Sequence, residues 1–379
     1  MGHFYQDIFY TYSDITIMPS RISNIDHRVE CNPYDCNGML PLFTAPMDTV
    51  VNEDNFKKFE SEKIYPILPR TFDLDKRVQY SIDGKWASYS LDEFESVFCN
   101  FDNKIETSYC ELYVSVDIAN GHMERLIEAV KKAKSIYGSE IKIMAGNIAN
   151  PRAYFDYAYS GVDYVRVGIG SGFACTTQSN TGVGCGMATL IHKVAECQEI
   201  YCEQNDISIK DCTKIIADGG IRKFSDIIKA LALGADYVMC GSVFCKMLES
   251  AAPKSGNSAE WLSLPLTTSI NDIKDIHKED DGWHGLLGGK EICLGDINAI
   301  YYGMASREGQ IALNGSKTKT SEGIKKVVTV DYTIHGWCEN FTDFLRSSMS
   351  YVGSECLYMF KKSAIIVINS KNAIAAVNE

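Results

Sequence analysis

The chain has 379 residues, of which 45% are hydrophobic and 23% charged, so it can bury a sizeable core and is not a disordered polymer. Lys and Arg number 37 against 49 Asp and Glu, and the formal charge of −12 argues against general binding to nucleic acid. No apolar run reaches the roughly 18 residues of a membrane span, and the first residues do not resemble a signal peptide. These features predict a cytoplasmic globular protein with neither a membrane nor a nucleic-acid partner.

Short apolar segments that end abruptly recur along the chain, and helical patterns over 123–138 and 225–235 lie between some of them. Apolar runs without polar alternation predict strands buried on both faces. Eight such strands alternating with helices predict an α/β fold, a (β/α)8 TIM barrel, with its chemistry at the carboxyl ends of the strands. An open doubly wound sheet is the alternative, but the glycine fingerprint that would follow its first strand is absent. The segments are 41–48, 63–70, 111–121, 141–147, 163–172, 214–220, 236–242 and 298–304.

Two stretches interrupt this pattern. Residues 71–108 are polar and aromatic, and they predict a helix with surface loops. Residues 253–292 are rich in Ser, Gly and Asp and predict a long irregular insertion, because a connection of about 40 residues exceeds ordinary loop lengths. With both treated as decorations, residues 1–379 are expected to form a single barrel domain.

The densest pattern of chemistry-bearing residues lies at 167–184, VGIGSGFACTTQSNTGVG. Gly168, Gly170 and Gly172 free the backbone for positive φ and for close approach of a ligand, and Cys175 follows, next to two threonines. A thiol held beside hydroxyls is a candidate nucleophile, while a glycine-rich turn with a buried cysteine is an equally good interpretation. The other 13 of the 14 cysteines are scattered without zinc-ligand spacing and are predicted to be reduced.

Two later strand ends predict a phosphate site. ADGG contributes Asp218, Gly219 and Gly220, and CGS contributes Gly241 and Ser242. In barrels, the loops after late strands bind phosphate through backbone N–H groups, although these glycines could simply make tight turns. At other strand ends, Asp48 and Asp117 could bind ribose hydroxyls or cap the helices that follow.

These motifs occur in an order that resembles the IMP dehydrogenase and GMP reductase family. The matching segments are DITIMPSR (14–21), APMDTV (45–50), DIANGH (117–122), MAGN (144–147), GIGSGFACTTQSNTGVG (168–184), ADGGIRKFSDIIKALALGADYVMCGS (217–242), YYGM (301–304), SEG (321–323) and MSYVGS (349–354). The resemblance implies a barrel that acts on a purine nucleotide with a nicotinamide cofactor, and it places Cys175 as the nucleophile that attacks C2 of the purine. The dehydrogenase forms the covalent intermediate by hydride transfer and hydrolyses it, whereas the reductase forms it by expelling ammonia and reduces it.

The flap expected at 305–323 distinguishes the two reactions. Dehydrogenases that resemble this chain carry an Arg-Tyr pair there, whereas Arg307 is not followed by tyrosine. The pattern is therefore nearer the reductase, in which Thr177 and Glu322 would assist the departure of ammonia. NADPH is the implied cofactor, with NAD as the alternative if the protein is an IMP dehydrogenase. The resemblance places substrate contacts at Asp218, Gly219, Gly220, Gly241, Ser242, Met304 and Gly323, and cofactor contacts at Asp117, Ala119 and Asn120.

Several features depart from the family or extend beyond the site. Pro69-Arg70 stand where the family has His-Lys, and arginine does not release a proton near neutral pH. Phe173 replaces a serine that reaches the phosphate. These two replacements leave a third hypothesis open, a catalytically silent barrel that binds a purine nucleotide. The resemblance also implies a homotetramer or a pair of tetramers, and a K⁺ ion held by the backbone carbonyls of Gly170, Gly172 and Cys175. A CBS regulatory domain, which dehydrogenases of the family usually carry, is not expected, because 379 residues leave no space for it beside the barrel and its two decorations.

Overall fold

The computed structural model describes residues 8–106, 111–256, 273–279, 282–287, 290–315 and 320–370. Eight parallel strands form one sheet in the order β2-β9-β8-β7-β6-β5-β4-β3. The ring closes between its two ends, because Phe43 and Tyr65 form a parallel bridge and the Thr44 N–H donates to the Tyr65 carbonyl at 3.0 Å. The strands are β2 (Leu42–Thr44), β3 (Ile67–Leu68), β4 (Trp86–Tyr89), β5 (Leu112–Val116), β6 (Ile141–Ile148), β7 (Tyr164–Val167), β8 (Lys214–Asp218) and β9 (Tyr237–Cys240).

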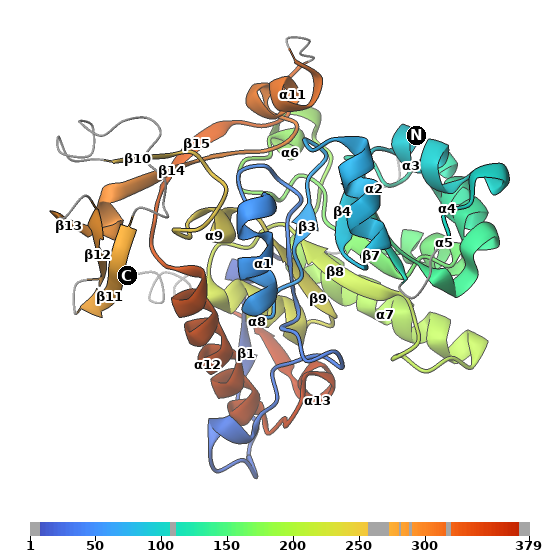
Figure 1. Ribbon diagram of the computed structural model, residues 1–379. Coiled ribbons are helices and arrows are strands. Elements are labelled where there is room, and N and C mark those ends of the chain that lie inside the picture. Colours follow the sequence, from blue (N-terminus) through green and yellow to red (C-terminus); the bar gives the residue numbers. More distant parts are fainter. Residues whose placement is uncertain are drawn as a thin grey trace.

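Helices connect successive strands and surround this ring, so the predicted (β/α)8 barrel is confirmed (Figure 1). The helical patterns over 123–138 and 225–235 correspond to α4 and α8. The helices up to β9 are α1 (Glu53–Ser61), α2 (Leu74–Ile82), α3 (Leu91–Phe98), α4 (Glu124–Tyr137), α5 (Ala153–Ser160), α6 (Thr177–Thr181), α7 (Met187–Asn205) and α8 (Phe224–Ala232). Those after it are α9 (Ser242–Cys245), α11 (Arg307–Asn314), α12 (Ile334–Val352) and α13 (Leu357–Ser363).

One of the eight predicted barrel strands was assigned to the wrong sheet. Segment 298–304 forms β14 (Ile297–Tyr302), which pairs antiparallel with β10 (Lys254–Gly256) and β15 (Lys325–Thr329) outside the barrel. Its residues alternate between buried and half-buried, as expected for a strand covered on one face. The missing barrel strand is β4, within the stretch 71–108 that was predicted to be a helix with loops. That stretch is a full barrel unit, α2-β4-α3.

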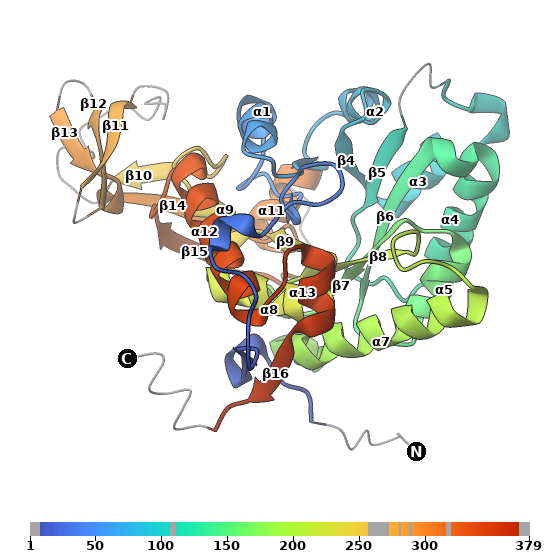
Figure 2. The ribbon, with the colours of Figure 1, turned by 90° about the horizontal axis from the view of Figure 1, so that it is seen from below.

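The insertion 253–292 is also more ordered than predicted. Besides β10, it contains β11 (Ile273–Glu279), β12 (Gly282–Leu287) and β13 (Lys290–Cys293), which form an antiparallel sheet of their own. Both small sheets project from the barrel on the side away from α3, α4 and α5 (Figures 1 and 2). Residues 257–272 lie outside the described residues.

Aromatic side chains fill the interior of the barrel at the amino ends of the strands. Phe43 contacts Tyr65, Trp86 and Tyr164 with ring centroids 4.9, 5.6 and 5.9 Å apart, and Tyr164 lies 5.7 Å from Tyr237. A two-stranded sheet of β1 (Ile15–Met18) and β16 (Ile365–Ile368) lies outside the barrel, and Figure 2 shows β16 next to α13. Because aromatic rings fill the amino end of the barrel interior, we expect the polar groups of an active site at the carboxyl ends of the strands. Within the described residues, none of the helices combines the length and apolar character that crossing a bilayer requires.

Candidate active site

The cysteine loop leaves the barrel directly after β7. Gly168 makes the turn with φ of +135°, and a Cβ at this position would lie 2.2 Å from the Asp218 carbonyl oxygen, so only glycine fits. The loop ends in the short helix α6, which begins at Thr177. Cys175 is exposed rather than buried, which favours the nucleophile over the alternative of a turn with a core cysteine.

Three of the predicted catalytic side chains form a continuous hydrogen-bonded chain. The Cys175 thiol donates to Thr177 Oγ1 at 3.3 Å, and the Thr177 hydroxyl donates to Glu322 Oε2 at 2.7 Å. Thr177 and Glu322 are 145 residues apart in sequence, so the flap must fold back onto the cysteine loop to make this contact. The chain of groups gives a proton a route between the thiol and the carboxylate.

Backbone pairing holds the end of the flap against the cysteine loop. Cys175 and Gly323 form an antiparallel bridge, the Thr176 N–H donates to the Glu322 carbonyl at 2.9 Å, and the Ile324 N–H donates to the Ala174 carbonyl at 2.9 Å. The preceding part of the flap is α11, whose first turn is capped by Ser306, with its hydroxyl accepting from the Gly309 N–H. Residues 316–319 of the predicted flap lie outside the described residues.

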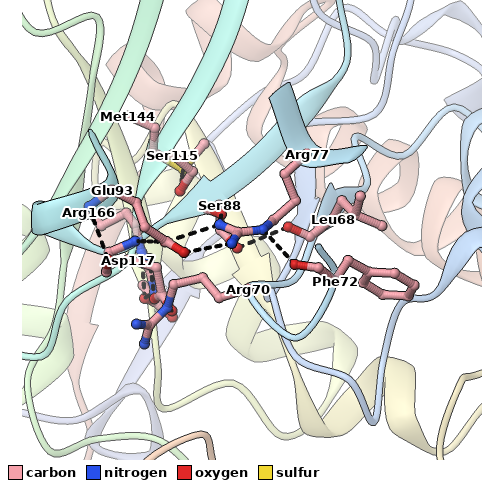
Figure 3. A network of polar contacts seen from close by, with 12 residues as sticks. Leu68, Arg70, Phe72, Arg77, Ser88, Glu93, Ser115, Asp117, Met144 and Arg166 are labelled. Atoms are coloured by element: carbon pink, nitrogen blue, oxygen red, sulfur yellow. Dashed lines mark hydrogen bonds and ion pairs between the residues drawn. The ribbon is translucent and has the colours of Figure 1, made fainter. Parts of the chain in front are cut away.

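Beneath the cysteine loop, the buried Arg166 binds two aspartates inside the barrel, Asp218 and Asp117, the second of which is labelled beside it in Figure 3. Arg166 on β7 donates from Nη1 to Asp117 Oδ1 at 2.9 Å and from Nη2 to Asp218 Oδ2 at 2.8 Å. Arg70 Nε donates to the other Asp117 oxygen at 3.1 Å, and Asn147 Nδ2 donates to Asp218 Oδ2 at 2.7 Å. The Arg166 side chain is only 8% exposed, and its charge is therefore matched by two carboxylates.

The opposite charges in this cluster shift the pKa values of Asp117 and Arg166 so that both groups stay ionised. Burial alone would raise the pKa of Asp117, but the neighbouring charges of Arg70 and Arg166 outweigh burial and hold that pKa below its usual value. Burial would likewise lower the pKa of Arg166, whereas Asp218 and Asp117 raise it above the ordinary arginine value. The Asp117 carboxylate and the Arg166 guanidinium are thus charged at neutral pH, and neither is available to give or take a proton there.

A cavity of about 210 Å³ lies at the carboxyl ends of the strands, between the cysteine loop, the loop after β8 and the flap. The structure brings most of the predicted site residues to its wall. The predicted residues that line it are Asp117, Gly172, Cys175, Asp218, Gly219, Gly220, Gly241, Ser242, Met304, Glu322 and Gly323. Thr177 lies behind Cys175 and Glu322, which it connects.

Some predicted residues are placed differently. Ala119 and Asn120 do not line the cavity; they lie exposed on the loop after β5. Gly170 packs against Gln178 at the start of α6, where an added Cβ would lie 2.8 Å from the Gln178 Cβ. The Gly172 carbonyl, predicted to bind K⁺, accepts the Cys175 N–H at 3.0 Å. A monovalent-cation site at these carbonyls stays a prediction.

The predicted phosphate loops are also partly engaged with the protein itself. The Gly220 N–H donates to the Ser171 carbonyl at 3.0 Å, so this amide is not directed at a ligand. Gly219 has a φ of +120° and lies so close to Ser171 that a Cβ would meet its hydroxyl oxygen at 2.2 Å. These glycines therefore make a tight turn and also line the cavity.

Phe173 brings positive charge to the cavity wall. The Lys326 Nζ lies 3.7 Å from the centroid of its ring, and the Arg222 guanidinium lies 5.9 Å from it, both in cation–π geometry. Neither cation has a carboxylate within ion-pair distance in the described part of the chain. Phe173 also packs near Tyr301, with ring centroids 6.0 Å apart, and Tyr301 lines the cavity beside Gly241. The position of the family's serine is thus occupied by an aromatic ring in contact with two cations, neither of which forms an ion pair among the described residues.

A larger cavity of about 1190 Å³ lies elsewhere, at the amino ends of β8 and β9, where Lys214 and Tyr237 line it. Its wall is mostly apolar and contains none of the predicted site residues. The smaller cavity is the candidate active site because it holds the cysteine, the carboxylate and the strand-end loops together.

Sequence reasoning did not find Arg166, Asn147, Tyr301 or the role of Lys326. Arg166 lies in the run DYVRVG, which was predicted to be buried on both faces. A charged residue in such a run must be paired, so it could have been recognised as part of a buried network. Its partners are 49 and 52 residues away and could not be named from the pattern.

Comparison with known proteins adds independent information. The family model described as IMP dehydrogenase / GMP reductase domain matches residues 110–259. The chain is 30% identical to a GMP reductase of Oceanobacillus iheyensis over 378 residues, covering 96% of this chain and 97% of that protein. It is 27% identical to a GMP reductase of Mesoplasma florum over 96% of this chain and 99% of that protein. An inosine-5'-monophosphate dehydrogenase of Borreliella burgdorferi is 30% identical over 89% of this chain and 70% of its own length.

Proposed function

Because the chain belongs to the IMP dehydrogenase / GMP reductase family, we propose that it is a GMP reductase, converting GMP or a closely related purine nucleotide to IMP and ammonia with NADPH. The observation that carries the proposal is the chain of hydrogen bonds from Cys175 through Thr177 to Glu322, which ends in the cavity. A deamination needs both a nucleophile at C2 and a proton for the leaving amine, and this chain of groups supplies both.

In the first half of the reaction, Cys175 Sγ bonds to C2 of the purine and the C2–amine bond breaks. The thiol proton passes through Thr177 Oγ1 to Glu322, since each hydroxyl or thiol already donates in that direction. Glu322 then returns a proton to the amine, which leaves as ammonia. One carboxylate thus serves as the base for the thiol and as the acid for the amine.

The second half needs a hydride at C2, which a nicotinamide cofactor would supply when bound. Cys175 Sγ would be the leaving group as C2 gains hydrogen, so that IMP is released and the thiolate is regenerated. The exposed loop after β5, with Ala119 and Asn120, fits a ligand at the barrel mouth, whereas Asp117 is held by Arg70 and Arg166. Asp117 would therefore influence cofactor binding indirectly, by holding Arg70, which is partly exposed beside it.

The nucleotide phosphate fits the side of the cavity formed by Gly241, Ser242 and Phe173. The Ser242 hydroxyl lies only 3.5 Å from the Ile221 carbonyl, a long contact that a phosphate oxygen could replace. The cations Arg222 and Lys326 on the Phe173 ring supply positive charge next to it, in a chain whose net charge is −12. This arrangement supports an anionic substrate despite the loss of the serine at position 173.

IMP dehydrogenase is the second candidate, favoured by the 30% identity to the Borreliella burgdorferi protein. The flap does not favour it, because Arg307 begins α11 and is followed by Glu308 rather than tyrosine. Purified protein mixed with GMP and NADPH, and separately with IMP and NAD, distinguishes the two by the absorbance of the reduced cofactor. A fall in the first mixture, absent in Cys175→Ala, supports the reductase. A rise in the second with no change in the first supports the dehydrogenase, and nucleotide binding without cofactor consumption supports the silent barrel.

A further inference from the structure

The sheet of β11, β12 and β13 carries a row of metal-binding residue types on one face. His277 on β11 pairs in register with His284 on β12, and His284 pairs with Cys293 on β13. Residues directly opposite each other on neighbouring strands direct their side chains to the same face. Two imidazoles and a thiol therefore follow one another across the three strands.

Two carboxylates lie on that same face. Glu279 and Glu291 are each two residues from a member of the row, and residues two apart on a strand share a face. The ligand atoms of His277, Glu279 and Glu291 all lie within 4.8 Å of one another. His277 Nε2 is 3.0 Å from Glu279 Oε1, and His284 Nδ1 is 3.9 Å from Glu291 Oε1. A single ion between these groups would need only small side-chain movements.

The backbone orients the first histidine for ligation. His277 Nδ1 lies 2.9 Å from the Asp275 carbonyl oxygen, so its N–H is occupied there and Nε2 faces Glu279. Metal-ligating histidines commonly hold their second ring nitrogen in this way, which fixes the tautomer and the ring direction. Asp275 has a positive φ of 50° and lies where the β11–β12 register shifts, so the local bend brings its carbonyl to the ring.

The sheet has little core of its own. Residues 274–279 are all exposed, while Ile273 is buried and packs close to Gly285, where a Cβ would lie 2.7 Å from the Ile273 Cγ2. Small modules with little buried apolar surface are commonly stabilised by a disulfide or a metal ion. Cys293 is a free thiol, so a disulfide does not stabilise this sheet.

We propose that this face of the β11–β13 sheet binds one divalent transition-metal ion, with His277, Glu279 and Glu291 as ligands and His284 beside them. Nitrogen and carboxylate donors at this spacing suit Zn²⁺, whereas Ca²⁺ and Mg²⁺ prefer oxygen donors only. Cys293, the next residue of the row, lies outside the three ligand atoms that come within 4.8 Å of one another. None of these residues lines the active-site cavity, so the ion would stabilise the insertion rather than take part in the reaction.

The test is a titration of the full-length chain with Zn²⁺ alone, followed by calorimetry and by competition with a chromophoric chelator. The wild type is expected to bind one Zn²⁺ per chain with a rise in the melting temperature, and His277→Gln with Glu291→Gln is expected to weaken binding by about 10- to 100-fold. His335→Gln is the matched control, because His335 is an exposed histidine that also contacts a glutamate, Glu62. Its affinity should equal that of the wild type.

Binding at the catalytic thiol is separated by Cys175→Ala, which should keep the tight site. Replacing Zn²⁺ with Co²⁺ gives a second readout, since a cobalt–thiolate absorption band lost in Cys293→Ser would place the thiol among the ligands. Equal Zn²⁺ affinity in the wild type and in the His277→Gln/Glu291→Gln variant would overturn the proposal, as would loss of the tight site in Cys175→Ala. Circular dichroism of each variant shows whether the fold is retained, so a failure to fold is not mistaken for loss of the site.

Discussion

Two polar clusters meet at the carboxyl end of the barrel, and they differ in burial and in how many of their groups are bonded. In the lower cluster, both Asp117 oxygens bind arginines and Arg166 binds two carboxylates. In the upper cluster, Cys175 is exposed, and within the described residues Glu322 uses only Oε2, toward Thr177. A saturated buried cluster fixes geometry, whereas a partly bonded, accessible cluster can exchange protons with a substrate. We therefore expect Arg166 to stabilise the fold, and we propose that Glu322 takes part in the reaction.

The largest expected effect comes from breaking the lower cluster. Arg166→Met leaves the half-buried carboxylates of Asp117 and Asp218 without their shared partner and is expected to lower the free energy of unfolding by about 3–5 kcal/mol. Urea unfolding measures the change. Arg125→Met is the matched control, because Arg125 also bridges two carboxylates, those of Asp92 and Glu95, but on the exposed surface, and its removal should leave the unfolding midpoint nearly unchanged. Equal effects of the two variants would contradict the structural role given to Arg166.

Breaking the upper cluster is expected to lower kcat and to leave the free energy of unfolding nearly unchanged. Glu322→Gln keeps the shape of the side chain but cannot accept the thiol proton, so kcat should fall by about 10²- to 10³-fold with little change in unfolding. Glu308→Gln, also in the flap, should retain near-normal turnover. Steady-state kinetics of both variants with GMP and NADPH provide the measurement, and a Glu322→Gln enzyme with normal kcat would remove Glu322 from the proton route.

The contribution of the lower cluster to stability should depend on pH. The pKa of Asp117 is lowered in the folded state, so the unfolded chain binds its proton first as the pH falls. The stabilisation from Asp117 is therefore complete well above pH ~4, the ordinary aspartate value, and is lost as the pH drops below it through the folded-state pKa. The stability difference between the wild type and Asp117→Asn should be about 1–3 kcal/mol at pH 7 and should shrink toward pH 3. If the stability difference between the wild type and Asp117→Asn instead grew on acidification, the pKa of Asp117 would not be lowered by folding.

The smallest expected effect tests the cations on Phe173. Lys326→Ala should raise KM for the nucleotide by about 5- to 10-fold, because one unpaired charge next to the proposed phosphate position is lost. Lys325→Ala is the control, since Lys325 is exposed on the same strand and is one residue away, on the other face of β15. The KM of the wild type should also rise with salt, more than that of Lys326→Ala. Equal KM values for both variants would exclude this role of Lys326.

Local sequence patterns predicted the parts of the molecule whose residues lie close together in the chain. The cysteine loop, the DGG loop and most barrel strands are short segments in which glycine or continuous apolar character determines the conformation. Thr177 and Glu322 were predicted through family resemblance rather than through the pattern, because 145 residues separate them.

The errors have physical causes in tertiary structure. Strand β4 was missed because its four residues include Ser88, which is fully buried and donates to the Leu68 carbonyl at 2.9 Å inside the barrel. Strand β14 was wrongly assigned to the barrel because it is a nearly continuous apolar run in the sequence. Its alternation between buried and half-buried residues, and its antiparallel pairing with β15, are seen only in the fold. Similarly, the sequence identifies Phe173 only as the replacement of a serine, and only the fold shows that Lys326 and Arg222 pack on its ring.

The proposed reaction requires that Cys175, one of 14 cysteines, bonds to the purine. The most direct test is to quench the wild-type enzyme during turnover of GMP with NADPH and to locate any covalent nucleotide by mass spectrometry of the peptides. We expect an adduct on the peptide that contains Cys175, and neither adduct nor IMP with Cys175→Ala. Sustained IMP formation by Cys175→Ala, or an adduct on another cysteine such as Cys185, would contradict it.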